Sequence, residues 1–353
     1  MSSQKGTVYL NENGWKNLAS KLDNLSPSKT FIIVDKNTEV HCLPHFLGRL
    51  NSLDSFEIIS IHPGENFKNI SSCLFVWDGL SRKGADRNSL IINLGGGVVT
   101  DLGGFVASTF KRGLPFINIP TSLLAMVDAS VGGKNGVDLG NIKNQIGVVQ
   151  LPEMVLLDLS FLDSLPTSQL LSGMAEMIKH GLIEDEITWK KIKSMDPTKK
   201  DEFESIVWES VGIKNKIVLE DPMEKGKRKL LNFGHTLGHA IESHFLNHKD
   251  RNPLLHGEAI AVGMILATHI SSEIFDLDKN KVSDITTHIL SLFPKQRFTK
   301  NDIEHIQNLT IYDKKNRNGK VLFVLMEDFG KFHYDCTVDK QLILNAFDYY
   351  ESF

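Results

Sequence analysis

Residues 89–104 read Ser-Leu-Ile-Ile-Asn-Leu-Gly-Gly-Gly-Val-Val-Thr-Asp-Leu-Gly-Gly. The apolar run before the glycines predicts a buried strand, and the stretch after them predicts a helix. Bare backbone amides at such a turn can approach a pyrophosphate, and the N-terminus of the helix faces its negative charge. The spacing is not that of a Gly-x-Gly-x-x-Gly fingerprint, so a nucleotide site and a tight structural turn are equally open on this motif alone.

Further apolar runs of the same kind lie at residues 31–35, 56–61 and 116–120. Strands that alternate with amphipathic helices predict a parallel sheet with crossover connections. After about residue 160 the β-branched runs become rare, and helical patterns cover residues 168–183, 202–220, 233–244 and 257–275. The sequence therefore predicts a Rossmann-like α/β domain over residues 1–163, followed by an all-α domain over residues 164–353.

Composition restricts the class of partner. The chain has 353 residues, a formal net charge of -4 and 41% hydrophobic side chains. Without an overall basic field, neither nucleic acid nor an acidic membrane surface is expected to bind, so an anionic small molecule must meet local lysines and arginines. Three scattered cysteines and the absence of a signal-like start indicate a reducing compartment, and we expect a cytoplasmic protein without membrane spans.

One glutamate and two or three histidines have the chemistry of a metal site. His235 and His239 lie four residues apart, so both project from one face of a predicted helix. Glu176 and His256 come from other predicted helices and would complete a site with nitrogen and oxygen ligands. Zinc suits this set, with one position left for a substrate oxygen. The spacing alone would make both His235 and His239 ligands.

Basic and amide side chains are scattered through otherwise small or apolar segments. They are Lys134, Lys143, Asn144, Lys214, Arg228 and Asn232. Taken singly, each lysine or arginine is typical of a protein surface. Together with a metal they would form a site for a small polyanion, because arginine binds carboxylates in a bidentate manner and lysine contacts phosphate as a point charge.

Five motifs, in this order along the chain, resemble those of 3-dehydroquinate synthases. They are Gly-Gly-Gly-x-x-x-Asp-Leu-Gly-Gly-Phe at 95–105, Pro-Thr-x-Leu-Leu-Ala-x-Val-Asp-x-Ser-Val-Gly-Gly-Lys at 120–134, Lys-Asn at 143–144, Ala-Glu-x-Ile-Lys at 175–179, and Asn-x-Gly-His-Thr-x-Gly-His at 232–239 followed by His-Gly-Glu at 256–258. The resemblance covers nearly the whole chain. Three departures are Thr100, Asn135 and His180, where glycine, threonine and tyrosine are usual.

The resemblance implies a ligand set of Glu176, His235 and His256 for Zn²⁺ or Co²⁺, which leaves His239 beside the substrate. It implies catalytic roles for His239, Glu224, Lys179, Lys134 and Asn144. NAD would be held by Asp35, Glu65, Lys68, Gly96, Gly97, Asp101, Thr121, Leu124 and Lys143. The substrate would meet Arg112, Asp128, Lys134, Asn144, Lys179, Lys214, Arg228, Asn232, His239 and Lys314, although Lys315 is an equal candidate for the last position. Arg112 would act across a homodimer.

The activity implied by the resemblance is the conversion of 3-deoxy-D-arabino-heptulosonate 7-phosphate to 3-dehydroquinate and phosphate. Two alternatives share the fold: a polyol dehydrogenase of the glycerol dehydrogenase type, and a sugar-phosphate cyclase whose substrate lacks a carboxylate. Lys214 and Arg228, which would bind a carboxylate, weigh against both. A binding protein that has lost the chemistry is a third alternative, and the complete set of ligands and charged contacts weighs against it.

Overall fold

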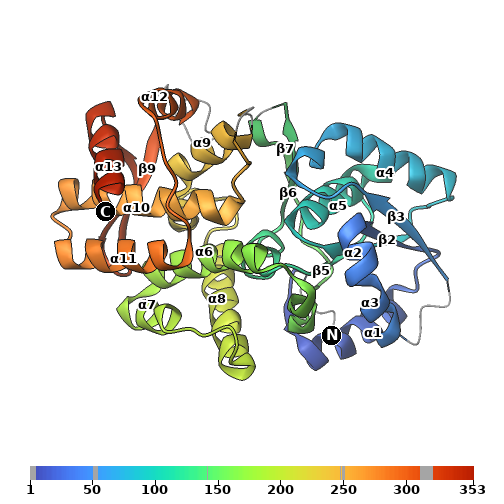
Figure 1. Cartoon of the computed structure of the whole chain (residues 1–353). Helices are drawn as coiled ribbons and strands as arrows, with labels where there is room; N and C mark the ends of the chain where they lie inside the picture. The colour runs from blue at the N-terminus through green and yellow to red at the C-terminus, as the bar shows by residue number, and fades with distance from the viewer. Residues whose placement is uncertain (1–4, 51–54, 141, 247, 249–250, 311–320) are drawn as a thin grey trace. The chain divides into compact units, whose positions relative to one another are not determined.

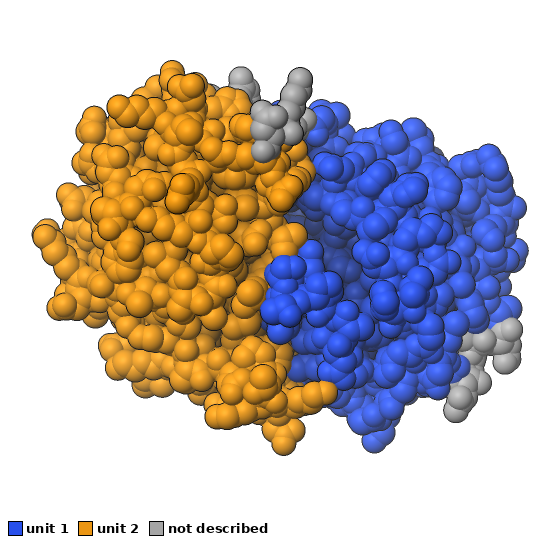
Figure 2. All heavy atoms as spheres, viewed as in Figure 1, with its two compact units in different colours: residues 1–170 blue, residues 171–353 orange. Residues whose placement is uncertain are grey.

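The computed structural model describes residues 5–50, 55–140, 142–246, 248, 251–310 and 321–353. Its contacts divide the chain into two compact units, residues 1–170 and 171–353, which Figure 2 distinguishes by colour. The units therefore divide within helix α6 (Thr167–Glu184), slightly after the division at 163 and 164 that the sequence suggests.

The first unit is built on a six-stranded parallel sheet with the strand order β1-β8-β5-β4-β2-β3. The four strands predicted from apolar runs are four neighbouring strands of the six. The sheet strands are β1 (Val8–Leu10), β2 (Thr30–Asp35), β3 (Phe56–Ile61), β4 (Leu90–Gly95), β5 (Phe116–Pro120) and β8 (Val155–Leu157). Strands β2, β4 and β5 are buried along their whole length, as near-continuous apolar runs in a covered parallel sheet require.

Helices cover this sheet (Figure 1). They are α1 (Asn11–Leu25), α2 (Lys36–His41), α3 (Leu43–Arg49), α4 (Ile70–Arg82) and α5 (Gly97–Thr109). Helices α4 and α5 pack Val76, Leu80, Leu102 and Val106 into one core with Phe31 and neighbouring strand residues. Helix α5 begins at Gly97, directly after β4, so the glycine segment does connect a strand to a helix as predicted.

A hairpin of β6 (Lys134–Leu139) and β7 (Ile142–Val149) lies outside the main sheet. The sequence did not reveal it, because glycine, asparagine, lysine and aspartate interrupt both strands and disfavour a strand assignment. Asn135, one of the departures from the family pattern, is buried in this hairpin. Its side-chain amide donates hydrogen bonds to the carbonyl oxygens of Gly133 and Gln150 at 2.9 and 2.8 Å. The unusual residue therefore ties the two ends of the hairpin together.

The second unit is helical, which confirms the predicted fold class. Its helices are α6, α7 (Glu186–Lys193), α8 (Lys200–Glu220), α9 (His235–Leu246), α10 (His256–Phe275), α11 (Lys279–Leu292), α12 (Lys300–Leu309) and α13 (Lys340–Ser352). The unit is not purely helical, however, because β9 (Leu322–Asp328) and β10 (Lys331–Thr337) form an antiparallel hairpin. The interior of β9 is buried and packs on α10, so tertiary contacts, more than local pattern, fix this strand.

Helix α10 is the centre of the second unit and contacts α9, α11, α13 and β9. By length and composition it could cross a membrane, and 67% of its most apolar window is buried inside the unit. Burial of this kind is the property of a core helix that is hydrophobic on all sides.

Helices α9 and α10 approach each other closely at a glycine. A Cβ atom added at Gly263 would lie 2.1 Å from the carbonyl oxygen of Gly234 and 2.8 Å from the amide nitrogen of Gly238. Both are backbone atoms, so no side-chain rotation can relieve the overlap. This crossing places the first turn of α9 against α10.

We therefore expect Gly263→Ala to destabilise the protein by about 3 kcal/mol, at the upper end of typical overpacking costs. The matched control is Gly212→Ala on α8, where an added Cβ meets nothing within 4 Å. That change should stabilise the helix by about 0.5–1 kcal/mol, since alanine is the better helix former. Urea unfolding of both variants measures the two effects. Equal effects of the same sign would contradict the close crossing.

Candidate active site

The residues predicted for the site fall in both units. In the second unit, helix α6 carries Glu176 and Lys179 at buried positions. One carboxylate oxygen of Glu176, Oε2, accepts a hydrogen bond from Lys179. The other, Oε1, is buried and accepts no hydrogen bond from any residue that the structure describes. Because a buried carboxylate oxygen is costly unless it is compensated, this atom is suited to bind a cation.

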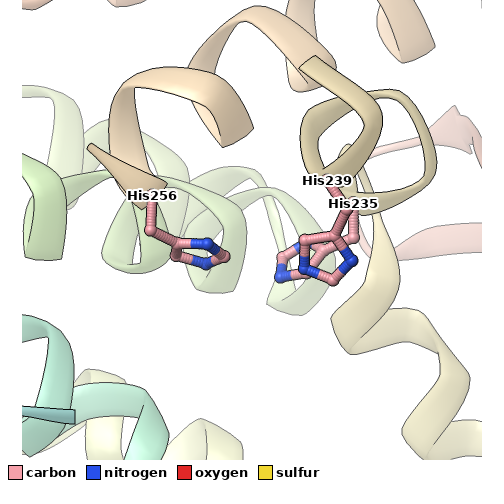
Figure 3. Close-up of side chains that lie close together, drawn as sticks. All are labelled: His235, His239 and His256. Atoms are coloured by element: carbon pink, nitrogen blue, oxygen red, sulfur yellow. The ribbon is translucent and has the colours of Figure 1, made fainter. Parts of the chain in front are cut away.

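Three histidines lie close together (Figure 3), and two of them, His235 and His256, approach this carboxylate. His235 and His239 project from the first two turns of α9, and His256 is the first residue of α10. The ring centroids of His235 and His239 lie 5.0 Å apart, and each lies 5.7 Å from the ring of His256. One nitrogen of each ring falls within 4.8 Å of the others. The structure therefore brings together the residues that the sequence proposed as a metal site.

Distances to Glu176 test whether a metal would fit. The Nε2 atoms of His235 and His256 lie 3.5 and 3.6 Å from Glu176 Oε1. Two ligand atoms at about 2.1 Å from a tetrahedral zinc are separated by about 3.4 Å. The observed distances are too long for strong hydrogen bonds but match two edges of a zinc polyhedron. Glu176, His235 and His256 therefore fit a zinc or cobalt ion.

The outer nitrogens of the two histidines are held by protein groups. His235 Nδ1 lies 3.0 Å from the carbonyl oxygen of Phe233, and His256 Nδ1 lies 3.1 Å from Glu242 Oε2. These contacts leave both Nε2 atoms directed toward Glu176. Sequence reasoning missed Glu242, although it lies seven residues after His235 and hence on the same face of the helix.

Charge around the carboxylate also favours a cation. Burial would raise the pKa of Glu176, but Lys179 and His235 hold it well below its ordinary value. Burial would lower the pKa of His256, but the carboxylates of Glu242 and Glu176 raise it to about 9. The site therefore favours positive charge at the point where the three side chains meet.

Other predicted residues of this unit surround the segment η5 (Lys227–Asn232). Asn232 donates a hydrogen bond to Glu224 Oε1 at 2.6 Å, and Arg228 donates one to the carbonyl oxygen of Pro222 at 2.7 Å. Both Arg228 and Lys214, on α8, are buried. Neither residue therefore has the surface position that is typical of a lysine or arginine.

In the first unit, the residues predicted for NAD binding gather at the carboxyl ends of three neighbouring strands. Asp35 ends β2, Gly96 follows β4, and Thr121 follows β5 and donates its amide hydrogen to the carbonyl oxygen of Gly95 at 3.0 Å. Gly97 starts α5, and Leu124 precedes a short π-helix at Ala125–Ala129. Ligands of open α/β sheets bind at such strand ends. The Asp35 carboxylate also caps α2, by accepting from the amides of Asn37 and Thr38.

A partly buried ion network lies beside these strand ends. Lys68 Nζ contacts Glu65 Oε1 at 2.9 Å and Asp101 Oδ2 at 3.5 Å, and Lys143 Nζ contacts Glu65 Oε1 at 3.0 Å. Burial would raise the pKa of Glu65, but Lys68 and Lys143 lower it overall. Burial raises the pKa of Asp101 to about 6 despite the opposing effect of Lys68. The network thus unites four predicted cofactor residues.

The remaining predicted residues of the first unit are more dispersed. Lys134 is exposed at the start of β6, and Asp128 lies in the π-helix. Asn144 adopts a positive φ of 50°, and its amide donates to Asp138 Oδ1 at 2.7 Å. Arg112 is exposed with a φ of 73°. Lys314 and its alternative at position 315 lie outside the described residues.

The raised pKa of Asp101 predicts a pH-dependent effect on stability without NAD. A carboxyl whose pKa is higher in the folded state contributes stability below pH 4 that is lost as the pH rises through about 6. An asparagine amide at this position would not titrate, so the stability of Asp101→Asn relative to the parent should increase between pH 4 and pH 7. Since each pKa unit corresponds to about 1.4 kcal/mol, we expect an increase of about 2 kcal/mol.

Urea unfolding at both pH values measures this difference. The control is Asp78→Asn on the exposed face of α4, where Asp78 pairs with Arg82. Its stability relative to the parent should change with pH by less than about 0.5 kcal/mol, as for most exposed positions. A pH-independent effect of Asp101→Asn would refute the assignment of a raised pKa to Asp101.

Family models match nearly three quarters of the chain. The model of the 3-dehydroquinate synthase N-terminal domain matches residues 58–172, and that of the C-terminal domain matches residues 173–316. The chain is 39% identical over 356 residues to a 3-dehydroquinate synthase of Parabacteroides distasonis, covering 100% of this chain and 99% of that relative.

Solved structures share the fold. A 2-epi-5-epi-valiolone synthase of Streptomyces hygroscopicus, with NAD⁺ and Zn²⁺ bound, gives a TM-score of 0.86 at 23% identity, over 100% of this chain and 98% of that one. A 2-deoxy-scyllo-inosose synthase, in complex with carbaglucose-6-phosphate, NAD⁺ and Co²⁺, gives 0.83 at 25% identity, over 96% and 95%. The two family models and the full-length relative together show that this chain belongs to the 3-dehydroquinate synthase family.

Proposed function

We propose that this chain converts 3-deoxy-D-arabino-heptulosonate 7-phosphate to 3-dehydroquinate and phosphate, a step of the shikimate pathway toward chorismate and the aromatic amino acids. Family membership and the full-length relative support this activity. The observation that carries the proposal for the site is the unsatisfied Oε1 of Glu176, which faces the Nε2 atoms of His235 and His256 at metal-ligand spacing.

In this proposal Glu176, His235 and His256 hold the divalent ion, and Lys179 stabilises the charged form of Glu176 through its second oxygen. When bound, the ion supplies Lewis acidity and NAD supplies reversible hydride acceptance, so the reaction consumes no net oxidant. The residues of the first unit that hold NAD include Glu65, Lys68 and Asp101. A cofactor that is regenerated within each turnover must stay bound throughout the turnover, which requires contacts from several residues.

The substrate carries a carboxylate and a phosphate, and we assign residues to each end. Lys214 and Arg228 bind the carboxylate, because buried cations of this kind are stabilised by an anion. Lys134, Asn144 and Asn232 contact the phosphate end, together with Lys314 and Arg112. Asp128 is a further substrate-binding residue. His239 and Glu224 transfer protons: His239 lies beside the ligand histidines, and Asn232 orients Glu224.

Assembly and location are also proposals. The protein acts as a homodimer in the cytoplasm, and Arg112 of each subunit reaches the phosphate bound by the other. Arg112 is exposed and has a positive φ, and this exposed position supports a contact with the neighbouring subunit. All three cysteines are free thiols, which agrees with a reducing compartment.

The deciding experiment measures phosphate release from 3-deoxy-D-arabino-heptulosonate 7-phosphate with zinc and a catalytic amount of NAD⁺. We expect one phosphate and one 3-dehydroquinate per substrate, without accumulation of NADH. NADH that accumulates with glycerol would identify a polyol dehydrogenase. Turnover of glucose 6-phosphate instead would identify a cyclase for substrates without a carboxylate. Tight NAD binding without any turnover would indicate a binding protein.

The metal assignment predicts that Glu176→Ala and His256→Ala each lower kcat/KM by at least about 100-fold, since removal of a ligand disrupts the ion site. NAD affinity should stay within about threefold, because the predicted NAD residues lie in the other unit. The control is His333→Ala, which removes a histidine paired with Glu327 on the hairpin β9 and β10. Near-parental turnover of either ligand variant would refute the ligand set.

The carboxylate assignment predicts a different signature for Arg228→Lys. Lysine keeps the charge but loses the bidentate geometry, so we expect KM for the heptulosonate to rise about tenfold or more. The zinc affinity of this variant should equal that of the parent protein. Steady-state kinetics and zinc titration measure the two quantities, and an unchanged KM would contradict the assignment.

A further inference from the structure

Glu242 is a buried carboxylate on the inner face of α9, with a side chain 7% exposed. Its Oε2 lies 3.1 Å from Nδ1 of His256, the first residue of the following helix. Burial of a carboxylate is expensive unless charged or polar groups compensate it. The contact therefore does more than fill space, since an apolar residue of similar size would fill the same volume at lower cost.

The contact decides which nitrogen of His256 carries a hydrogen. A carboxylate can only accept, so Nδ1 must donate, and the lone pair of a neutral ring then resides on Nε2. This Nε2 is the atom that lies 3.6 Å from the unsatisfied Oε1 of Glu176. Glu242 thus selects the tautomer and the ring orientation that present a lone pair to the ion site.

The two ligand histidines are supported differently. His235 Nδ1 faces a neutral carbonyl oxygen, that of Phe233, at 3.0 Å, whereas His256 Nδ1 faces an anion. A negatively charged acceptor increases electron density on the ring more than a carbonyl does, and so makes Nε2 the better donor. His256 is accordingly the ligand whose strength depends most on its outer partner.

We propose that Glu242 is a positioning residue that holds His256 in its ligating tautomer and thereby tightens the binding of a divalent ion. This inference rests on the proposed ion site at Glu176, His235 and His256. The role is additional to the ligand set, because Glu242 acts through His256.

A second histidine cluster at the other end of α9 provides a comparison. Asp302 Oδ1 lies 3.0 Å from His244 Nε2, while its Oδ2 accepts from the Thr299 amide at 2.8 Å and contacts Arg251 at 3.0 Å. Both oxygens of Asp302 are thus satisfied by protein groups, unlike Oε1 of Glu176. Together with His248, Asp302 and His244 form a second group that could hold a metal ion, but both carboxylate oxygens of Asp302 already contact protein groups.

The test measures the zinc affinity of the full chain by competition with a chromophoric chelator. We expect Glu242→Ala to weaken zinc binding by about 10–100-fold, the usual effect of losing an outer partner. Glu242→Gln keeps an acceptor oxygen for Nδ1 but loses the charge, so it should weaken binding less, by about 3–10-fold. Asp302→Asn should lower the melting temperature but leave zinc affinity within about twofold.

A second readout reports the tautomer itself. Long-range ¹H–¹⁵N correlation spectra of the zinc-loaded parent protein should show His256 protonated at Nδ1 alone, with Nε2 shifted by the metal. In Glu242→Ala, the ¹⁵N chemical shift of His256 Nε2 should move toward the value of a ring that binds zinc more weakly. In Glu242→Gln, this chemical shift should return most of the way to the parent value. A purely structural role would leave this signature unchanged.

Each outcome has a defined meaning. If Glu242→Ala folds and binds zinc within twofold of the parent, the positioning role is wrong while the ion site stands. If Glu242→Ala does not fold, the same criterion applies to Glu242→Gln. If the parent protein binds no zinc, or if His256→Ala does not weaken binding, the proposed ion site itself fails and the inference fails with it.

Discussion

The buried carboxylate of Glu176 is the constraint around which the second unit is organised. It lies on a helix whose surroundings are apolar, and only one of its oxygens is satisfied by Lys179. An uncompensated charge at this depth would cost several kcal/mol. Two histidine nitrogens therefore converge on the remaining oxygen from α9 and α10, at the separation that a shared cation would produce. The site therefore depends on the packing of all three helices.

Glycines make that convergence possible. A Cβ atom at Gly257 would lie 2.1 Å from the carbonyl oxygen of Ser172, so only glycine lets the start of α10 approach α6 this closely. Ser172 also accepts the amide hydrogen of Gly257 at 2.9 Å, which fixes the approach. His256, directly before this glycine, is thereby held near Glu176. The Gly257 and Gly263 contacts together determine where the ligand side chains can meet.

The sequence alone was enough to predict the strands and helices whose residue pattern is visible along the chain. Runs such as Phe31–Asp35 became fully buried strands, and the long helical patterns of the second half became α6, α8, α9 and α10 to within a few residues. Strands β1 and β8 have three residues each, too few for a period to be visible. Strand β9 depends on its contact with α10, which the sequence does not reveal. The role of Glu242 likewise follows from its contact with His256, which only the folded structure shows. The ligand set itself came from resemblance, since spacing alone favoured both His235 and His239.

In both units, charged side chains lie away from the surface and are paired with other charged or polar side chains. In the first, Lys68 lies among Glu65 and Asp101, with Lys143 on the outer side of Glu65. In the second, Lys179 contacts Glu176 and Glu242 contacts His256. Apolar side chains at these positions would give a more stable protein, because ion pairs seldom recover their desolvation cost. Charged side chains at these positions lower the free energy of unfolding of the ligand-free protein. Ligands that bind only the folded form raise it again. The polar groups are thus preorganised for cofactor and ion, which is what a recycled cofactor and a transferred proton require.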